Sequence, residues 1–113
     1  MSTISDEQVQ KALDWMREGA ADGAKARAHR VYLDEYLSAY LAKLAAEYME
    51  TGDSAAAANI KAKASQGYHD LLTTLRQAVE LDELFRWRRS SAEAVMSAWQ
   101  TMRANERAMG KLQ

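Results

Sequence analysis

The chain has no proline among its 113 residues, and its only strong interior stop is the polar stretch Thr51-Gly52-Asp53-Ser54. Proline inside a helix costs about 3 kcal/mol, and apolar residues here recur at intervals of three and four. The sequence therefore predicts an all-α fold in a single domain, 1–113. We expect a long antiparallel helical hairpin, with one helix over about 6–50, a turn at 51–54 and a second helix over about 55–109.

The first helix has a clear start signal and a weak point. Ser5 stands three residues before Gln8, the spacing of a capping box, in which each residue satisfies a backbone N–H of the other. Further along, Gly19 and Gly23 each cost a helix about 1 kcal/mol relative to alanine. We expect a kink or a short break there, with residues 6–17 as a separate helix in the second case.

The second helix carries two lines of residues at heptad spacing. The first seam consists of Tyr68, Leu71, Leu75, Ala78, Asp82, Phe85, Arg89, Ala92, Met96, Trp99, Arg103 and Glu106. The second seam, which lies beside it towards the C-terminus, contains Leu81, Leu84, Val95, Met102 and Met109, with Arg88 on the same line. A helix that packs on one neighbour needs one narrow seam, so the wider face predicts a second neighbour.

Two helices alone bury too little apolar surface to make a comfortable core. We therefore expect a homodimer that forms a four-helix bundle through the broad face of residues 81–102. A monomeric bundle of three or four helices, broken at Gly19, Gly23 and Gly67, is the alternative. The expected interface residues are Leu81, Asp82, Leu84, Phe85, Arg89, Ala92, Val95, Met96, Trp99 and Met102.

Two charged residues fall on the first seam one heptad apart, Asp82 and Arg89. Charges on a seam are costly unless they are paired. In an antiparallel crossing near Phe85, Asp82 of each copy would face Arg89 of the other and would fix the register. Alternatively, the seam turns towards solvent at this point.

Composition excludes several classes of protein. The absence of cysteine rules out disulfides and thiolate metal sites. The acidic N-terminus lacks the apolar run of a signal peptide, and no segment approaches the roughly 20 apolar residues that span a bilayer. We expect a cytoplasmic protein that makes no membrane contact.

The sequence shows no catalytic signature. His29 and His69 are the only histidines, and neither belongs to a metal-binding motif. Ser90 and Ser91 lack the glycine elbow of a nucleophile, and there is no glycine-rich loop after a strand. We expect no enzyme activity, no cofactor and no metal.

Charge is distributed unevenly. Residues 1–85 hold nine Lys/Arg and fourteen Asp/Glu, a net charge of −5, whereas residues 86–113 hold six and two, a net charge of +4. On a helix, the basic residues of the second segment share one face, apart from Arg88, and Trp87 could stack on a base. The candidate nucleic-acid-binding residues are Arg86, Trp87, Arg89, Arg103, Arg107 and Lys111.

Helical pairing competes with this interpretation. Asp82 lies four residues before Arg86, and Glu106 lies three after Arg103, so both arginines could be neutralised within the helix. On the first helix, Tyr32, Tyr36 and Tyr40 recur every fourth residue. Such a stripe is typical of the shoulder of a core or interface.

Several stretches together resemble a family of small, all-helical proteins encoded in bacteriophage and prophage genomes. They are Val31-Tyr32-Leu33-Asp34-Glu35-Tyr36, Leu75-Arg76-Gln77-Ala78-Val79-Glu80, Arg86-Trp87, Ala98-Trp99 and Asn105-Glu106-Arg107-Ala108-Met109. The likeness covers roughly residues 9–110, and the alanine-rich chain from Met49 to Gly67 departs from it. The resemblance implies no catalytic residues, and it implies a phage setting that includes recombination and replication genes.

The leading hypothesis is a non-enzymatic accessory protein of phage type that binds another protein, in DNA metabolism or in takeover of a bacterial host. The partner is unidentified. The alternative is direct binding of nucleic acid by the basic C-terminal helix.

Overall fold

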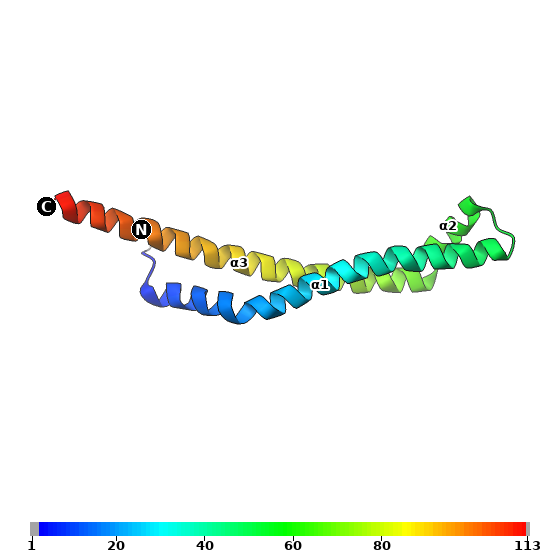
Figure 1. The fold of residues 1–113 in the computed structure, drawn as a ribbon, viewed down its shortest axis with the longest axis horizontal. Coiled ribbons are helices and arrows are strands. Elements are labelled where there is room, and N and C mark those ends of the chain that lie inside the picture. The colour runs from blue at the N-terminus through cyan, green and yellow to red at the C-terminus, as the bar shows by residue number, and fades with distance from the viewer. Residues whose placement is uncertain (1–2, 113) are drawn as a thin grey trace. The chain divides into compact units, whose positions relative to one another are not determined.

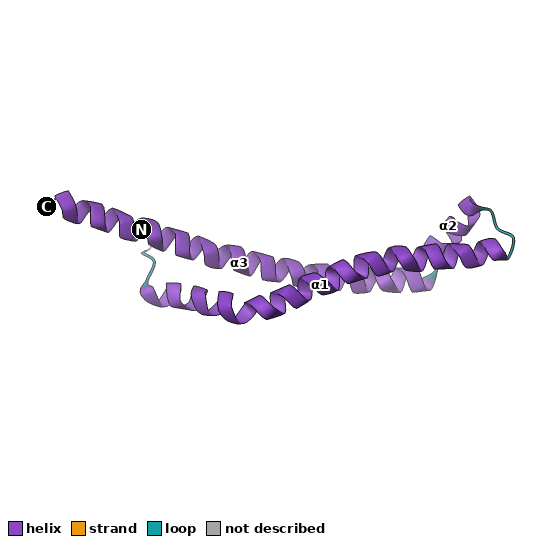
Figure 2. Cartoon of the chain, viewed as in Figure 1, coloured by secondary structure: helices purple, strands orange, loops and turns teal. Residues whose placement is uncertain are grey.

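The computed structural model describes residues 3–112 of the chain. Three helices follow one another: α1 (Asp6–Glu50), α2 (Ala55–Ala64) and α3 (Gln66–Leu112). Helix accounts for almost all of the described chain, with short loops before α1, after it and before α3 (Figure 2). The all-α helical hairpin expected from the sequence is confirmed, with α1 and α3 as its arms and α2 in the connection between them (Figure 1).

The chain divides into two compact units. The terminal unit joins the residues up to Ala24 with those from Glu83 onwards, so it contains the first part of α1 and the larger part of α3. The central unit runs from Lys25 to Asp82 and contains the rest of both helices together with all of α2.

The capping box at the start of α1 is present as the sequence predicts. The backbone N–H of Ser5 donates to Oε1 of Gln8 (2.8 Å), and the backbone N–H of Gln8 donates to Oγ of Ser5 (3.1 Å). Two N–H groups that the helix itself leaves unbonded are satisfied in this way.

The turn at 51–54 is also where the sequence places it. Gly52 adopts a positive φ of 106°, a conformation that is open to glycine and strained for other residues. The N–H of Asp53 returns to the carbonyl oxygen of Tyr48 (3.2 Å), which closes the end of α1. Ser54 then caps α2, because its Oγ accepts the N–H of Ala57 (3.2 Å).

The prediction of one continuous helix over 55–109 is wrong at Ser65, where the backbone is extended (ψ 148°). Ser65 closes one helix and opens the next. Its hydroxyl donates to the carbonyl of Ala62 (2.6 Å) at the end of α2, and it accepts the N–H of Tyr68 (3.3 Å) in the first turn of α3. One side chain therefore satisfies backbone groups on both sides of the break.

The expected break at the first two glycines is not found. Helix α1 continues through Gly19 and Gly23, so residues 6–17 are not a separate helix. A bend is visible in the blue N-terminal part of α1 (Figure 1). Packing explains why the helix persists: the indole of Trp15 lies against Gly19, and the ring of Phe85 lies opposite Gly23.

The core of the central unit is built from alanines. Ala45 of α1 packs with Ala58 and Ala62 of α2, whose exposed fractions are 0% and 1%. Leu41, Leu44 and Tyr48 pack around them. Small side chains let the two helices approach closely, which explains why the alanine-rich stretch is a packed element.

The terminal unit has a thinner core. Val9 and Ala12 of α1 and Ala92 of α3 are buried, and Trp15 stacks on Phe85 with ring centroids 6.4 Å apart. Among the described residues, no large side chain is fully buried. The chain alone therefore leaves much of its large apolar surface partly open to water.

Candidate interaction surface

The first seam of α3 is largely used inside the chain. Ala78, Asp82 and Ala92 are buried, and Tyr68, Leu71, Leu75, Phe85, Met96 and Trp99 are half-buried. Its charged positions Arg89, Arg103 and Glu106 are exposed. Three of the interface residues predicted on this line have partners on α1: Phe85 stacks on Trp15, Trp99 donates to Asp6, and Asp82 accepts from Arg30.

The second seam remains open over the terminal unit. Leu84 is 44% exposed and Met109 is 63% exposed, whereas Val95 and Met102 are half-buried. The same heptad spacing places Arg88, Ser91 and Ala98 on this line, and all three are exposed. The result is a helix face with the spacing of a second neighbour that the terminal unit covers only in part, at Val95 and Met102.

Trp87 extends this open face. Its side chain is 70% exposed, the largest exposed fraction among the large apolar residues of the described chain. A shallow hollow of about 450 Å³ lies beside it, lined by Trp15, Trp87, Arg88, Ser91 and Ala92. Two indoles therefore border one concave patch of the terminal unit.

The expected pairing of Asp82 with Arg89 of a second copy is corrected by the structure. The Asp82 side chain is buried, and its Oδ2 accepts a hydrogen bond from Nη1 of Arg30 in the same chain (3.0 Å). Leu81, the other predicted interface residue of the central unit, is 47% exposed.

Two arginines of the predicted nucleic-acid set are neutralised. Arg86 pairs with Glu83 (2.9 Å), and not with Asp82 as its spacing suggests. Arg103 pairs with Asp6 of α1 (3.1 Å) and with Glu106 (3.5 Å), so its expected partner within the helix is confirmed. Its guanidinium also lies 5.4 Å from the ring centre of Trp99.

The remaining cations of α3 are exposed. Arg88, Arg89, Arg107 and Lys111 make no ion pair with any residue in the part of the chain that the structure describes. The basic stripe is therefore divided into paired and unpaired positions. The exposed Trp87 follows Arg86 in sequence but lies on the face of the second seam.

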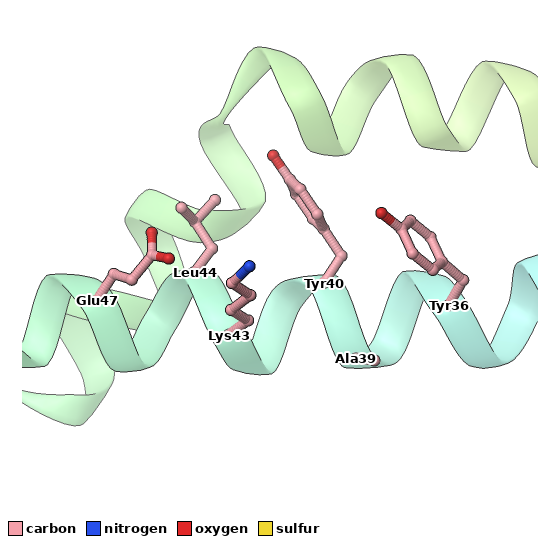
Figure 3. Close-up of a pocket in the computed structure, with 6 residues that line it drawn as sticks. All are labelled: Tyr36, Ala39, Tyr40, Lys43, Leu44 and Glu47. Atoms are coloured by element: carbon pink, nitrogen blue, oxygen red, sulfur yellow. The ribbon is translucent and has the colours of Figure 1, made fainter.

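The tyrosine stripe of α1 borders a groove in the central unit. Tyr32 and Tyr36 stack on each other (6.0 Å) and are exposed, whereas Tyr40 is half-buried and its hydroxyl reaches Gly67. The groove of about 370 Å³ is lined by Tyr36, Ala39, Tyr40, Lys43, Leu44 and Glu47, with both labelled tyrosine rings directed towards α3 (Figure 3). The stripe is thus a shoulder of the packed pair, as its spacing predicts.

Neither a metal centre nor a membrane span emerges from residues 3–112. No group of three or more His, Asp or Glu side chains in that range is placed to hold a metal ion. No helix there combines the length and apolar character that crossing a membrane requires. The ring of His69, one of the two histidines, lies edge-on to the ring of Tyr68, with the ring centroids 5.8 Å apart.

Comparison with family models, with curated proteins and with solved structures finds no match to this chain. The surface of α3 is therefore interpreted from its own geometry.

Two contacts that shape this surface have no local sequence signal. Arg30 and Asp82 are 52 residues apart, and Asp6 and Arg103 are 97 residues apart. Helical spacing finds partners within one helix, as it does for Arg103 and Glu106, but it carries no information on partners across a hairpin whose register is unknown.

Proposed function

We propose that this protein is a non-enzymatic binding protein whose partner is a helix docked on the second seam of α3, and that a second copy of the chain is its first partner. The observation that supports this most is the contrast between the two seams in the terminal unit. The apolar positions of the first, Phe85, Ala92, Met96 and Trp99, are buried or half-buried, whereas Leu84, Ser91 and Ala98 on the second are exposed.

A four-helix bundle is the arrangement that satisfies both seams. Helices from two hairpins would then lie against each other, and the small residues Ser91 and Ala98 would permit close approach between them. Arg88 is compatible with such a face, because its aliphatic stem can lie along the seam while its guanidinium stays in water.

The target beyond the second copy is a host macromolecule, and we place its action in the cytoplasm of a bacterial cell, in DNA metabolism or host takeover. The resemblance to small helical phage proteins supports this setting. The absence of a recognisable catalytic motif supports a role in binding.

Light scattering with two matched variants tests the proposal. We expect wild-type protein at tens of micromolar to have twice the 12.7 kDa mass of one chain, or 25.4 kDa. Leu84→Asp should return the mass to that of one chain. Ile60→Asp, at a position of α2 that is 69% exposed and outside the seam, should remain dimeric. A wild-type mass of 12.7 kDa contradicts the proposal, and so does an equal fall in mass for Leu84→Asp and Ile60→Asp.

A second candidate function, binding of nucleic acid, is favoured by one specific observation. Trp87 is 70% exposed, and the next residue, Arg88, makes no ion pair with a described residue, whereas Arg86 on its other side pairs with Glu83. An exposed indole can stack on a base while neighbouring guanidiniums contact phosphates.

This second candidate makes a numerical prediction. Because Arg86 and Arg103 are paired, Arg89, Arg107 and Lys111 are the unpaired members of the stripe. Three phosphate contacts give a slope of about −3 for log affinity against log salt on a duplex. Arg89→Ala should reduce that slope by about 1 without changing base preference. No binding at about 50 mM salt with tens of micromolar protein removes this candidate.

A further inference from the structure

The first residue of α1 lies against the basic end of α3. Oδ1 of Asp6 accepts two hydrogen bonds at once, from Nε1 of Trp99 (3.2 Å) and from Nη2 of Arg103 (3.1 Å). The guanidinium of Arg103 in turn lies near the face of the Trp99 ring (5.4 Å to its centre). One carboxylate is therefore held by an indole donor and a cation that are themselves in contact.

Beyond this contact, α3 continues without cover from α1. Every described side chain from Arg103 to Lys111 is exposed, and in Figure 1 the red end of α3 extends past the blue start of α1. Arg103, Arg107 and Lys111 recur every four residues, which spaces them about 6 Å apart along the helix. A hollow of about 530 Å³ lies here, lined by Trp99, Gln100, Arg103, Glu106 and Arg107.

The donors that hold Asp6 are those that bind phosphate. A guanidinium and an indole N–H donate to a phosphate oxygen in the same way as to a carboxylate oxygen, and a guanidinium binds either group strongly. The exposed Arg107 adds a second cation to the same hollow. Asp6 thus occupies the position that an external anion would take.

We propose that Trp99, Arg103 and Arg107 form a phosphate-binding site for nucleic acid, and that Asp6 fills it in the free protein as an internal competitor. This inference rests on the second candidate function. It changes that function in one respect: Arg103, which is neutralised in the free chain, becomes a phosphate contact when nucleic acid displaces Asp6.

The competing contact is weak enough to be displaced. The Asp6 side chain is 77% exposed and that of Arg103 is 46% exposed. An exposed ion pair of this kind shifts an equilibrium by at most about fivefold. Removal of the Asp6 charge should therefore raise the affinity for nucleic acid by about three- to fivefold.

The chain offers a close control for the test. Glu7 is in the same turn of α1, is 79% exposed and pairs with Lys11 (3.4 Å), so Glu7→Gln removes the same charge without touching the site. Asp6→Asn removes the charge at the site and keeps the shape of the side chain. Labelled single-stranded and double-stranded oligonucleotides are titrated with wild-type protein and with both variants over a range of salt concentrations.

We expect Asp6→Asn alone to bind more tightly and to steepen the salt slope by about 1, because Arg103 gains a phosphate. Arg103→Gln in the Asp6→Asn protein should abolish that gain. If Asp6→Asn and Glu7→Gln raise the affinity equally, the effect comes from net charge and Asp6 is not a competitor, although nucleic-acid binding stands. If the wild-type protein binds and neither variant differs from it in affinity, Asp6 is again not a competitor. If none binds, both the site and the second candidate are overturned. Binding of a polyglutamate peptide in place of the oligonucleotides would also overturn the inference, by assigning the site to an acidic protein.

Discussion

Asp82 is the only buried polar or charged residue among those that the structure describes. Its bond to Arg30 (3.0 Å) joins α3 to α1 inside the central unit. A carboxylate in an apolar seam is tolerated only in the alignment that brings its partner opposite it. We therefore expect the pair to specify the register of α1 and α3 within the central unit more than it adds stability.

Replacement of Asp82 by alanine should lower the free energy of unfolding by about 2–3 kcal/mol, since Arg30 then stays in the seam without that carboxylate. The cost lies below that of a fully buried pair because the Arg30 side chain is 31% exposed. Asp6→Ala, which breaks an exposed pair, should cost less than about 1 kcal/mol. Urea denaturation of both variants measures the difference, and equal losses would contradict a special role for Asp82.

Substitution by alanine should change the free energy of unfolding in opposite directions at Gly67 and Gly23. At Gly67 an added Cβ would meet the hydroxyl and ring of Tyr40, with Cζ at 2.9 Å, so Gly67→Ala should destabilise by about 1–3 kcal/mol. At Gly23 the nearest atoms, those of Phe85, are 3.7 Å away, so Gly23→Ala should stabilise α1 by about 0.5–1 kcal/mol.

Thermal melts of both alanine variants check the signs. Tyr40→Phe removes the hydroxyl that the new methyl group meets, so Gly67→Ala should cost less in that background. A loss of equal size in both backgrounds would mean that the close approach is not the cause.

At the scale of the elements, much of the hairpin could be predicted from the sequence. The cap at Ser5 and the turn at Gly52 depend on residues within four positions of each other, and both were predicted correctly. The break at Ser65 was missed because its signal is weak: no Glu or Gln stands three residues later, and the surrounding alanines favour helix. The packing of Ala58 and Ala62 on Ala45 then makes α2 a separate element.

Ser65→Ala removes the side-chain bonds to both helices that meet there. A single cap is worth about 1 kcal/mol, so the loss of both should cost about 1–2 kcal/mol. Ser38→Ala, at an exposed position inside α1, is the control and should change stability little. Chemical denaturation compares the two, and a Ser65→Ala protein as stable as the control would argue that packing alone maintains the break.

The candidate site was predicted in part. The heptad positions of both seams follow from periodicity, and the structure shows which seam is covered. The pairing of Arg86 was wrong because Asp82, its expected partner, is bonded by Arg30 from the other arm. Whether a seam is covered, and which distant carboxylate reaches an arginine, depends on the register between arms that sequence spacing does not contain.

At the scale of the whole molecule, the charges that are unevenly distributed along the sequence balance one another within the terminal unit. The terminal unit holds eight Lys/Arg and eight Asp/Glu, because the basic end of the chain folds with its acidic beginning. The contact of Asp6 with Arg103 is a direct instance. A net charge of +4 in residues 86–113 is thus balanced inside the fold, which favours the protein-binding function over nucleic acid.

In the dimer that we propose, the thin core of each chain should make stability depend on association. With no large side chain fully buried among the described residues, the partner should supply much of the apolar burial. We therefore expect the melting temperature to rise with protein concentration, as mass action requires for a folded dimer. Leu84→Asp should remove this dependence. A wild-type melting temperature that is independent of concentration would contradict the account.

The most direct test of the central claim, that another helix covers the second seam, uses a single cysteine as a reporter in a chain that has none. Ala98→Cys places a thiol on that seam, and Ala104→Cys places one on a different face of α3; both positions are exposed in the single chain. The rate of reaction with a maleimide is measured in dilute and in concentrated protein. The account predicts that concentrated protein protects the thiol at position 98 several-fold and leaves the thiol at position 104 unprotected. Equal reactivity of the two thiols at every concentration would contradict it.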